Sequence, residues 1–187
     1  MAATLLHANV QWTVGASPGL ALPSGGDIEH YQAGFAPGID LRLTGFAPVI
    51  GVNLAAAYAS MSGPTGDSSQ LSNRYVPVTV SIFTDFSPLI PNATVLPYLR
   101  LGLGPCYWDI RNHGVLFRTL DSTQSKQLDY DLQAAAGVEK NLGRSPLSVF
   151  AEVTADYITS THYRKYGIYD KDDFFTVLRI GLRFHTR

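Results

Sequence analysis

The sequence predicts an all-β protein, namely an eight-stranded antiparallel up-and-down transmembrane β-barrel formed by one domain over residues 1–187. Apolar residues alternate with small or polar residues in about eight segments, as they do in strands with one apolar face. The connections between these segments are alternately long and short, so every long loop falls at one end. Both features are typical of a barrel whose apolar face meets lipid.

The first strand is expected at His7–Ala16. One face carries polar or small residues, namely His7, Asn9, Gln11, Thr13 and Gly15. The other face carries Ala8, Val10, Trp12, Val14 and Ala16. Because successive side chains of a strand point to opposite faces, this segment has one apolar and one polar side.

The same alternation places the other seven strands at Tyr31–Leu43, Ile50–Ser60, Arg74–Asp85, Val95–Ile110, Gln127–Lys140, Leu147–Ile158 and Phe174–Phe184. The long loops are expected at Pro18–His30, Met61–Asn73, Arg111–Lys126 and Thr159–Asp173. The short turns are expected at Thr44–Val49, Phe86–Thr94 and Asn141–Pro146.

The composition limits the function classes. Charged residues make up 16% of the chain, compared with roughly 25% in soluble domains. The net charge of −1 gives no basic surface for nucleic acid. No apolar run approaches the roughly 18 residues that a spanning helix needs. The first residues, Met1–Leu6, lack the features of a signal peptide, which fits both a cytosolic protein and a secreted protein whose signal was removed. For a membrane barrel we expect that a signal was removed.

Alternation alone does not say which face meets oil, because a soluble lipocalin-like ligand carrier also has eight strands. The expected strands are about 10–14 residues long, enough for the roughly 9–11 that cross a bilayer. Their polar face combines Gly, Ala and Ser with several full charges, which suits a narrow lumen. Six aromatic residues share the apolar face near the long-loop end and predict an interfacial belt: Tyr31, Tyr58, Tyr107, Tyr130, Tyr157 and Phe174.

Several charged residues point to the predicted lumen, and buried charges are tolerated when they are paired. We therefore expect a network of ion pairs in the half near the short turns. Its members are Asp40, Arg42, Arg100, Glu139, Glu152, Arg179 and Arg183.

Asp129, Asp131 and Asp156 lie on the same polar face, closer to the long loops. They fit either a divalent cation site or, as we expect, a solvated rim, since no calcium-loop spacing accompanies them. We expect no metal, no cofactor and no catalytic residue; His7 is interpreted as a packed lumen side chain.

Pro37 and Pro105 fall near strand centres, where each removes a ladder hydrogen bond. We expect local bulges at these positions. The alternative is a weakened seam that admits lipid sideways.

The chain resembles the small eight-stranded outer-membrane barrels of Gram-negative bacteria, the OmpA/OmpX-like superfamily. Pro97–Pro105 and Leu147–Glu152 are similar to strands of that family, and Arg179–Phe184 resembles its C-terminal assembly signal, although His185–Arg187 follow. The lipid A deacylases on this scaffold place Ser two positions after His, whereas Arg164 stands two positions after His162.

The resemblance implies a location in the bacterial outer membrane, with outer-membrane lipid as the surrounding partner. The function expected is that of a non-enzymatic structural or interaction protein, with a lumen plugged by charged side chains and long loops that bind partners. A lipid-modifying enzyme and a soluble ligand carrier remain the alternatives. Val115–Phe117, Tyr163, Tyr166 and Tyr169 either contact another envelope protein or fold over the barrel mouth.

Overall fold

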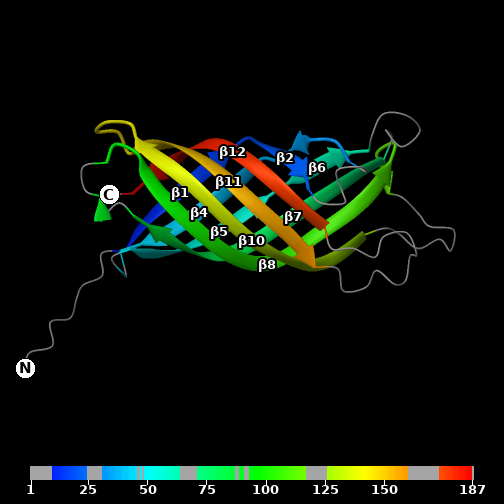
Figure 1. Ribbon diagram of the computed structural model, residues 1–187, viewed down its shortest axis with the longest axis horizontal. Coiled ribbons are helices and arrows are strands. Elements are labelled where there is room, and N and C mark those ends of the chain that lie inside the picture. Colours follow the sequence, from blue (N-terminus) through cyan, green and yellow to red (C-terminus); the bar gives the residue numbers. More distant parts are fainter. Residues whose placement is uncertain are drawn as a thin grey trace, which may run out of the picture.

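The computed structural model describes residues 10–24, 31–45, 47, 49–63, 71–86, 89–90, 93–116, 126–159 and 173–186. Figure 1 shows these residues as tilted strands that surround a common long axis. In this part of the chain, no helix is long and apolar enough to span a bilayer. The strands are β1 (Gln11–Ser17), β2 (Gly19–Pro23), β3 (Gly34–Phe35), β4 (Gly38–Thr44), β5 (Ile50–Ala57), β6 (Ala59–Ser62), β7 (Leu71–Asp85), β8 (Leu96–Asn112), β9 (Val115–Leu116), β10 (Lys126–Asn141), β11 (Leu147–Thr159) and β12 (Asp173–His185).

Eight wall strands close into a ring. The pairs β1 with β2, β3 with β4, and β5 with β6 each form one wall strand, and β7, β8, β10, β11 and β12 form the other five. Each described pairing between neighbouring wall strands is antiparallel, and β12 pairs with β1, where Phe184 lies opposite Val14. The predicted eight-stranded antiparallel up-and-down barrel is therefore confirmed.

Three wall strands are interrupted at mid-height, two of them beside a proline. Pro18 separates β1 from β2, and Ala36–Pro37 separate β3 from β4. Two backbone bonds bridge neighbouring wall strands at this level: the amide of Ala36 donates to Gly19 at 2.8 Å, and the amide of Tyr58 donates to Pro37 at 3.0 Å. The walls therefore stay connected where ladder bonds are missing.

The expected bulges at Pro37 and Pro105 are wrong. Ser17 pairs with Gly38 and Leu20 pairs with Phe35. The two pairs are three residues apart on both strands, so no extra residue is inserted between them. The β7–β8 ladder likewise continues in one register from Pro77 opposite Cys106 to Val80 opposite Leu103.

A bulge would insert an unmatched residue. An unmatched residue also tends to turn the following side chains to the other face. The apolar residues on both sides of each proline must face outward, so the ladder keeps its register. The prolines have no N–H group, so the ladder lacks the hydrogen bonds that they would have donated.

Several strands extend further than the alternation predicted, whereas Tyr31–Ala33 of the expected strand Tyr31–Leu43 precede β3 and are not part of a strand. Part of the expected loop Pro18–His30 is strand β2, and the ends of Met61–Asn73 belong to β6 and β7. Residues 1–9 lie outside the described residues, so the expected strand over His7–Asn9 stays a prediction.

A short hairpin joins β8 to β9 within the expected loop Arg111–Lys126. His113 and Gly114 form its turn, with φ values of 50° and 78°. Two consecutive residues with positive φ are typical of the turns that match the twist of a two-residue hairpin.

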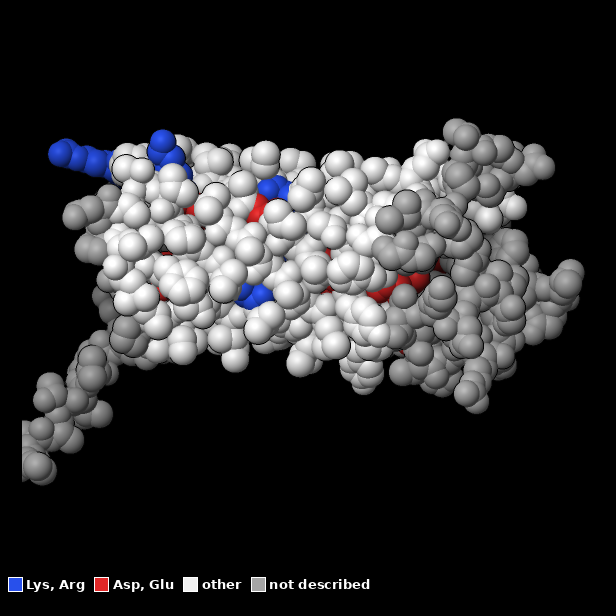
Figure 2. Space-filling view, in the orientation of Figure 1, with Lys and Arg blue, Asp and Glu red and all other residues white. Residues whose placement is uncertain are grey.

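The side chains separate cleanly between the two faces of the wall. Leu101 and Ile180 are 69% and 66% exposed on the outside, whereas Arg100 and Glu152 are 3% and 6% exposed in the lumen. Figure 2 shows the visible face of the wall as almost entirely uncharged atoms. An apolar belt of this extent is stable in contact with lipid and would cause association in water.

We predict that Leu101→Arg lowers the free energy of unfolding in lipid vesicles by about 2–4 kcal/mol, the typical penalty for Arg near the bilayer midplane. Urea titration followed by tryptophan fluorescence measures this change. Val115→Arg, in the β9 hairpin outside the wall, is the matched control and is expected to change the stability little. Equal stability of both variants would contradict a lipid-facing position for Leu101.

Candidate functional site in the barrel lumen

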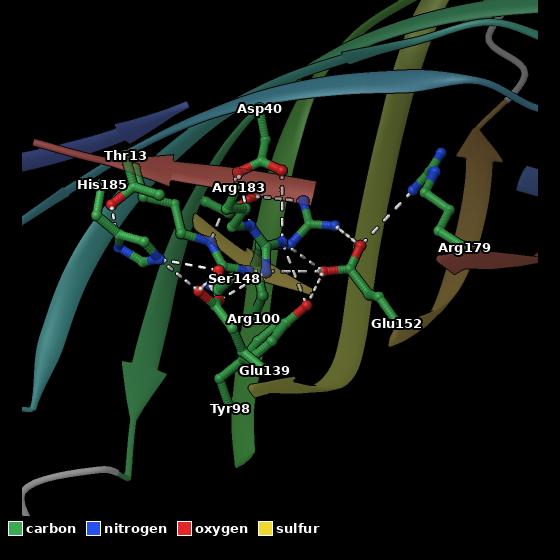
Figure 3. A network of polar contacts seen from close by, with 12 residues as sticks. Thr13, Asp40, Tyr98, Arg100, Glu139, Ser148, Glu152, Arg179, Arg183 and His185 are labelled. Carbon is green, nitrogen blue, oxygen red and sulfur yellow. Dashed lines mark hydrogen bonds and ion pairs between the residues drawn. The ribbon is translucent and has the colours of Figure 1, made fainter. Parts of the chain in front are cut away.

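The seven charged residues expected in the lumen come together in one network. They lie on five wall strands, with Asp40 and Arg42 on β4, Arg100 on β8, Glu139 on β10, Glu152 on β11, and Arg179 and Arg183 on β12. Each occupies an inward position of its strand, so ring closure turns residues far apart in sequence toward one axis. Figure 3 shows the contacts among them.

The part of the network near the short turns is built on Arg183. Its Nη1 lies 2.8 Å from Glu139 Oε2, and its Nε lies 3.3 Å from Asp40 Oδ2. Arg42 Nη1 reaches the same Glu139 oxygen at 3.2 Å. Two guanidinium groups from different wall strands therefore share one carboxylate.

Glu152 occupies the centre of the network. Its carboxylate lies 2.8 Å from Arg100 Nη2, and the guanidinium groups of Arg42, Arg179 and Arg183 lie at 3.7–3.9 Å. Tyr98 donates a hydrogen bond to Glu152 at 3.0 Å. This carboxylate is therefore the single acceptor on which four cations converge.

Aromatic rings cover the flat faces of two of these guanidinium groups. Arg42 lies 4.9 Å from the ring centre of Phe83 and 4.1 Å from that of Tyr98. Arg183 lies 3.5 Å from the ring centre of Phe150. Cation–π contacts stabilise desolvated arginine, so the rings replace part of the water that would stabilise these two guanidinium groups in solution. These aromatic residues alternate along their strands in step with the inward-facing charged residues. That position in the sequence pattern could have identified them as lumen residues.

Sequence reasoning also missed a polar group at the seam between β1 and β12. His185 Nε2 lies 3.0 Å from Glu139 Oε1 and 2.9 Å from Ser148 Oγ, and its Nδ1 lies 3.1 Å from Thr13 Oγ1. Thr13 pairs directly with His185 in the ladder. His185 lies two positions after the inward-facing Arg183. Strand alternation could therefore have predicted that His185 also faces the lumen.

Two cavities border the network. The central cavity has a volume of about 20 Å³ and is lined by residues that include Arg100, Glu152 and Arg179. A vestibule of about 380 Å³ at the short-turn end is lined by residues that include Thr13, Arg42 and His185. The central cavity has room for about one water molecule, whereas the vestibule has room for several.

The expected solvated rim is wrong for Asp129, Asp131 and Asp156, which are all buried, with 2%, 0% and 1% exposure. Asp129 accepts hydrogen bonds from Trp108 Nε1 and Gln127 Nε2, both at 2.7 Å. Within the described ranges, no three His, Cys, Asp or Glu side chains are placed to hold a metal ion. The carboxylates are buried because side chains fill the lumen above them.

That filling is an apolar cluster near the long-loop end. It contains Ala21, Ala36, Ala59, Met61, Tyr75, Cys106, Trp108, Ile158, Phe175 and Val177. Tyr75 and Phe175 stack with ring centres 5.1 Å apart, and Tyr75 donates to Asp173 at 2.8 Å. The lumen therefore has a charged half and an apolar half.

The six aromatic residues expected in the belt do not all behave alike. Tyr107, Tyr130, Tyr157 and Phe174 are exposed on the outside of the wall, and Tyr58 is half-buried. Tyr31 differs, because it packs against the apolar cluster and accepts a hydrogen bond from Asn73 Nδ2 at 3.4 Å. It precedes β3 and is not held to strand alternation, which explains the wrong placement.

The loop residues singled out in the sequence are described only in part. Val115 on β9 is 71% exposed. His7, His30, His162, Phe117, Tyr163, Tyr166 and Tyr169 lie outside the described residues.

Solved structures with the same fold are outer-membrane proteins. Neisserial surface protein A has 17% sequence identity to this chain and a TM-score of 0.58, over 94% of this chain and 96% of its own. OprG from Pseudomonas aeruginosa has 14% identity and a TM-score of 0.55, over 95% and 96%. A major outer membrane protein from Thermus thermophilus has 14% identity and a TM-score of 0.54, over 93% and 99%.

No protein-family model matches the sequence, and no curated protein is significantly similar to it. The likeness to the solved structures therefore establishes the fold, which is that of the small outer-membrane β-barrels. The exposed apolar residues of the wall agree with this fold, because they suit contact with lipid.

We predict that Glu152→Gln lowers the free energy of unfolding by about 3–5 kcal/mol, because it leaves the four guanidinium groups without their shared anion. Urea unfolding of the refolded barrel in vesicles measures the change. Lys140→Gln is the control, since Lys140 is an exposed charge near the short-turn end of β10. Its substitution is expected to change the stability little, and a Glu152→Gln barrel as stable as the wild type would contradict the central role of this carboxylate.

Proposed function

We propose that the protein is a non-enzymatic outer-membrane β-barrel, a structural or interaction protein. In this proposal the lumen is plugged by charged side chains, and the long loops bind partners outside the cell. The observation that carries the proposal is the convergence of four arginines on Glu152 around a cavity of about 20 Å³.

The network supports a plug rather than a pore. A hydrated ion that crossed the centre would have to separate Arg100 from Glu152, which are 2.8 Å apart and almost completely buried. Breaking a buried pair of this kind costs several kcal/mol. An eight-stranded barrel is also just wide enough for its interior to be filled by side chains.

The histidine at the seam does not have the geometry of a serine hydrolase. In a Ser-His-acid triad the nucleophile and the carboxylate contact different ring nitrogens. In this lumen Ser148 and Glu139 both contact Nε2 of His185, and Ser148 donates directly to Glu139. This arrangement favours a structural clamp on Glu139.

The long connections are the expected site of specificity, because loops on a rigid scaffold carry most binding residues. Val115 supports this assignment, since it is a strongly exposed apolar side chain on the β8–β9 hairpin. The partners proposed are outer-membrane lipid around the wall and other envelope proteins at the loops.

We predict that the wild-type barrel gives no single-channel steps in a planar bilayer. The matched variant is the double substitution Arg100→Ser with Glu152→Ser, which removes one cation and one anion from the centre of the network and is expected to conduct. Folding of both proteins is checked by the shift in gel mobility on heating. Single-channel current steps of equal size from the wild type and the variant would contradict the proposal that the lumen is plugged.

The interaction role is tested with a photo-crosslinking amino acid at Val115 in living cells. Envelope-protein adducts are expected there, whereas the same amino acid at the lipid-facing position Ile82 is expected to give lipid adducts only. Lipid adducts alone at both positions would contradict a loop-mediated partner.

The alternative of a lipid-modifying enzyme is tested by mass spectrometry of lipid A from cells with and without the gene. We expect identical acylation patterns, because the described lumen offers no hydrolase geometry. An acyl chain gained or lost on deletion would favour the enzyme.

A further inference from the structure

Two carboxyl groups lie side by side between the charged network and the apolar cluster. Asp131 on β10 and Asp156 on β11 both point inward, and Gln133, two positions from Asp131, pairs with Asp156 in the ladder. Asp131 and Asp156 therefore occupy diagonal positions on the lumen face of the ladder, where side chains are neighbours, and both residues are almost completely buried. Neighbouring strands therefore place two acids in one desolvated site.

Three of the four carboxyl oxygens of this pair lack a donor among the described residues. Among the described residues, none donates a hydrogen bond to either oxygen of Asp131 or to Oδ2 of Asp156. The remaining oxygen, Asp156 Oδ1, accepts a bond from Gln133 Nε2. An ionised carboxylate only accepts hydrogen bonds, so two ionised groups in contact would repel each other at low dielectric.

We propose that Asp131 and Asp156 bind one proton between them at neutral pH, so that the pair carries a single negative charge. The proton turns one of the two neighbouring acceptors into an O–H donor. Adjacent carboxyl groups share a proton in this way when both cannot ionise together.

The charges that face the pair are consistent with one negative charge. Arg100 on β8 and Arg179 on β12 are the nearest cations, and Asp129, Glu152 and the thiol of Cys106 are the other titratable groups nearby. The network below holds four arginines and three carboxylates, namely Arg42, Arg100, Arg179, Arg183, Asp40, Glu139 and Glu152. Four minus three leaves one positive charge, and the formal charges of Asp129 and of the pair are negative, so a proton on the pair lowers the excess of negative charge in the lumen.

A proton also suits the available space. The central cavity and the vestibule are lined by other residues and do not reach Asp131 or Asp156. A metal ion needs several oxygen ligands and room for them, whereas a proton needs neither.

The hydrogen bonds assign the proton to Asp131. Arg100 donates to Gln133 Oε1, which leaves the Gln133 amide group to donate to Asp156. Asp156 is therefore held as the ionised acceptor, and Asp131 is the group that donates. Through Gln133 the pair is joined to the network, so loss of the proton would place an unbalanced charge directly below the apolar cluster.

Infrared difference spectroscopy of the refolded wild-type barrel tests the proton directly. We expect the C=O band of a protonated carboxylic acid at neutral pH, shifted on exchange into D₂O and absent from Asp131→Asn. A spectrum without this band at neutral pH would overturn the proposal, whatever the stability of any variant.

Urea unfolding from mildly acidic to alkaline pH provides the second test. The unfolded chain releases the carboxyl protons above about pH 4, whereas the folded pair keeps one, so the wild-type midpoint is expected to fall as the pH rises and to level off once the folded pair has lost its proton. We call this fall the alkaline decrease. Asp131→Asn is expected to keep the neutral-pH midpoint, because its amide also donates to Asp156, and to lose the alkaline decrease.

Asp129→Asn is the matched control on the same strand. Its carboxylate already has two donors, so this substitution is expected to lower the midpoint and leave the alkaline decrease intact. Equal losses in the two variants would contradict a neutral Asp131. A midpoint that rises with sodium or calcium at constant ionic strength would show a bound metal ion instead and would also overturn the proposal.

Discussion

Ring closure between β1 and β12 is the constraint on which the other features depend. In lipid, each unpaired backbone donor or acceptor costs several kcal/mol, so a sheet cannot keep an open edge and must close on itself. Closure fixes the width of the lumen, and the width decides which inward side chains can meet. Arg42 and Glu152 are 3.8 Å apart because β4 and β11 are brought together across the ring. Ser148 and His185 both contact Glu139, and His185 also contacts Thr13 across the seam, so these side chains connect the closing seam to the interior.

Much of the fold follows from residue alternation alone. Leu101 and Arg100 are neighbours in sequence, yet their opposite faces were predictable because side chains alternate along a strand. The seven members of the charged network were predictable for the same reason. Their individual pairings were not, since the distance between two inward residues depends on strand order, register and ring closure, which lie beyond any single segment.

The missed features are those for which alternation gives a weak signal. Ala21, Ala36 and Met61 belong to the apolar cluster, but they lie beside prolines or in stretches rich in loop-forming residues. Their burial became visible only when the wall strands continued past Pro18 and Pro37 in unchanged register. The rim assigned to Asp131 failed for a related reason, because the sequence did not show that an apolar layer covers it.

The two tryptophans of the chain occupy opposite environments in this barrel. Trp12 faces outward from β1 near the short turns and is 48% exposed, whereas Trp108 is buried in the lumen near the long loops and donates to Asp129. A quencher carried on acyl chains would therefore reach the indole of Trp12 and be shielded by the wall from that of Trp108. Emission from single-tryptophan variants would thus report separately on membrane insertion and on closure of the interior.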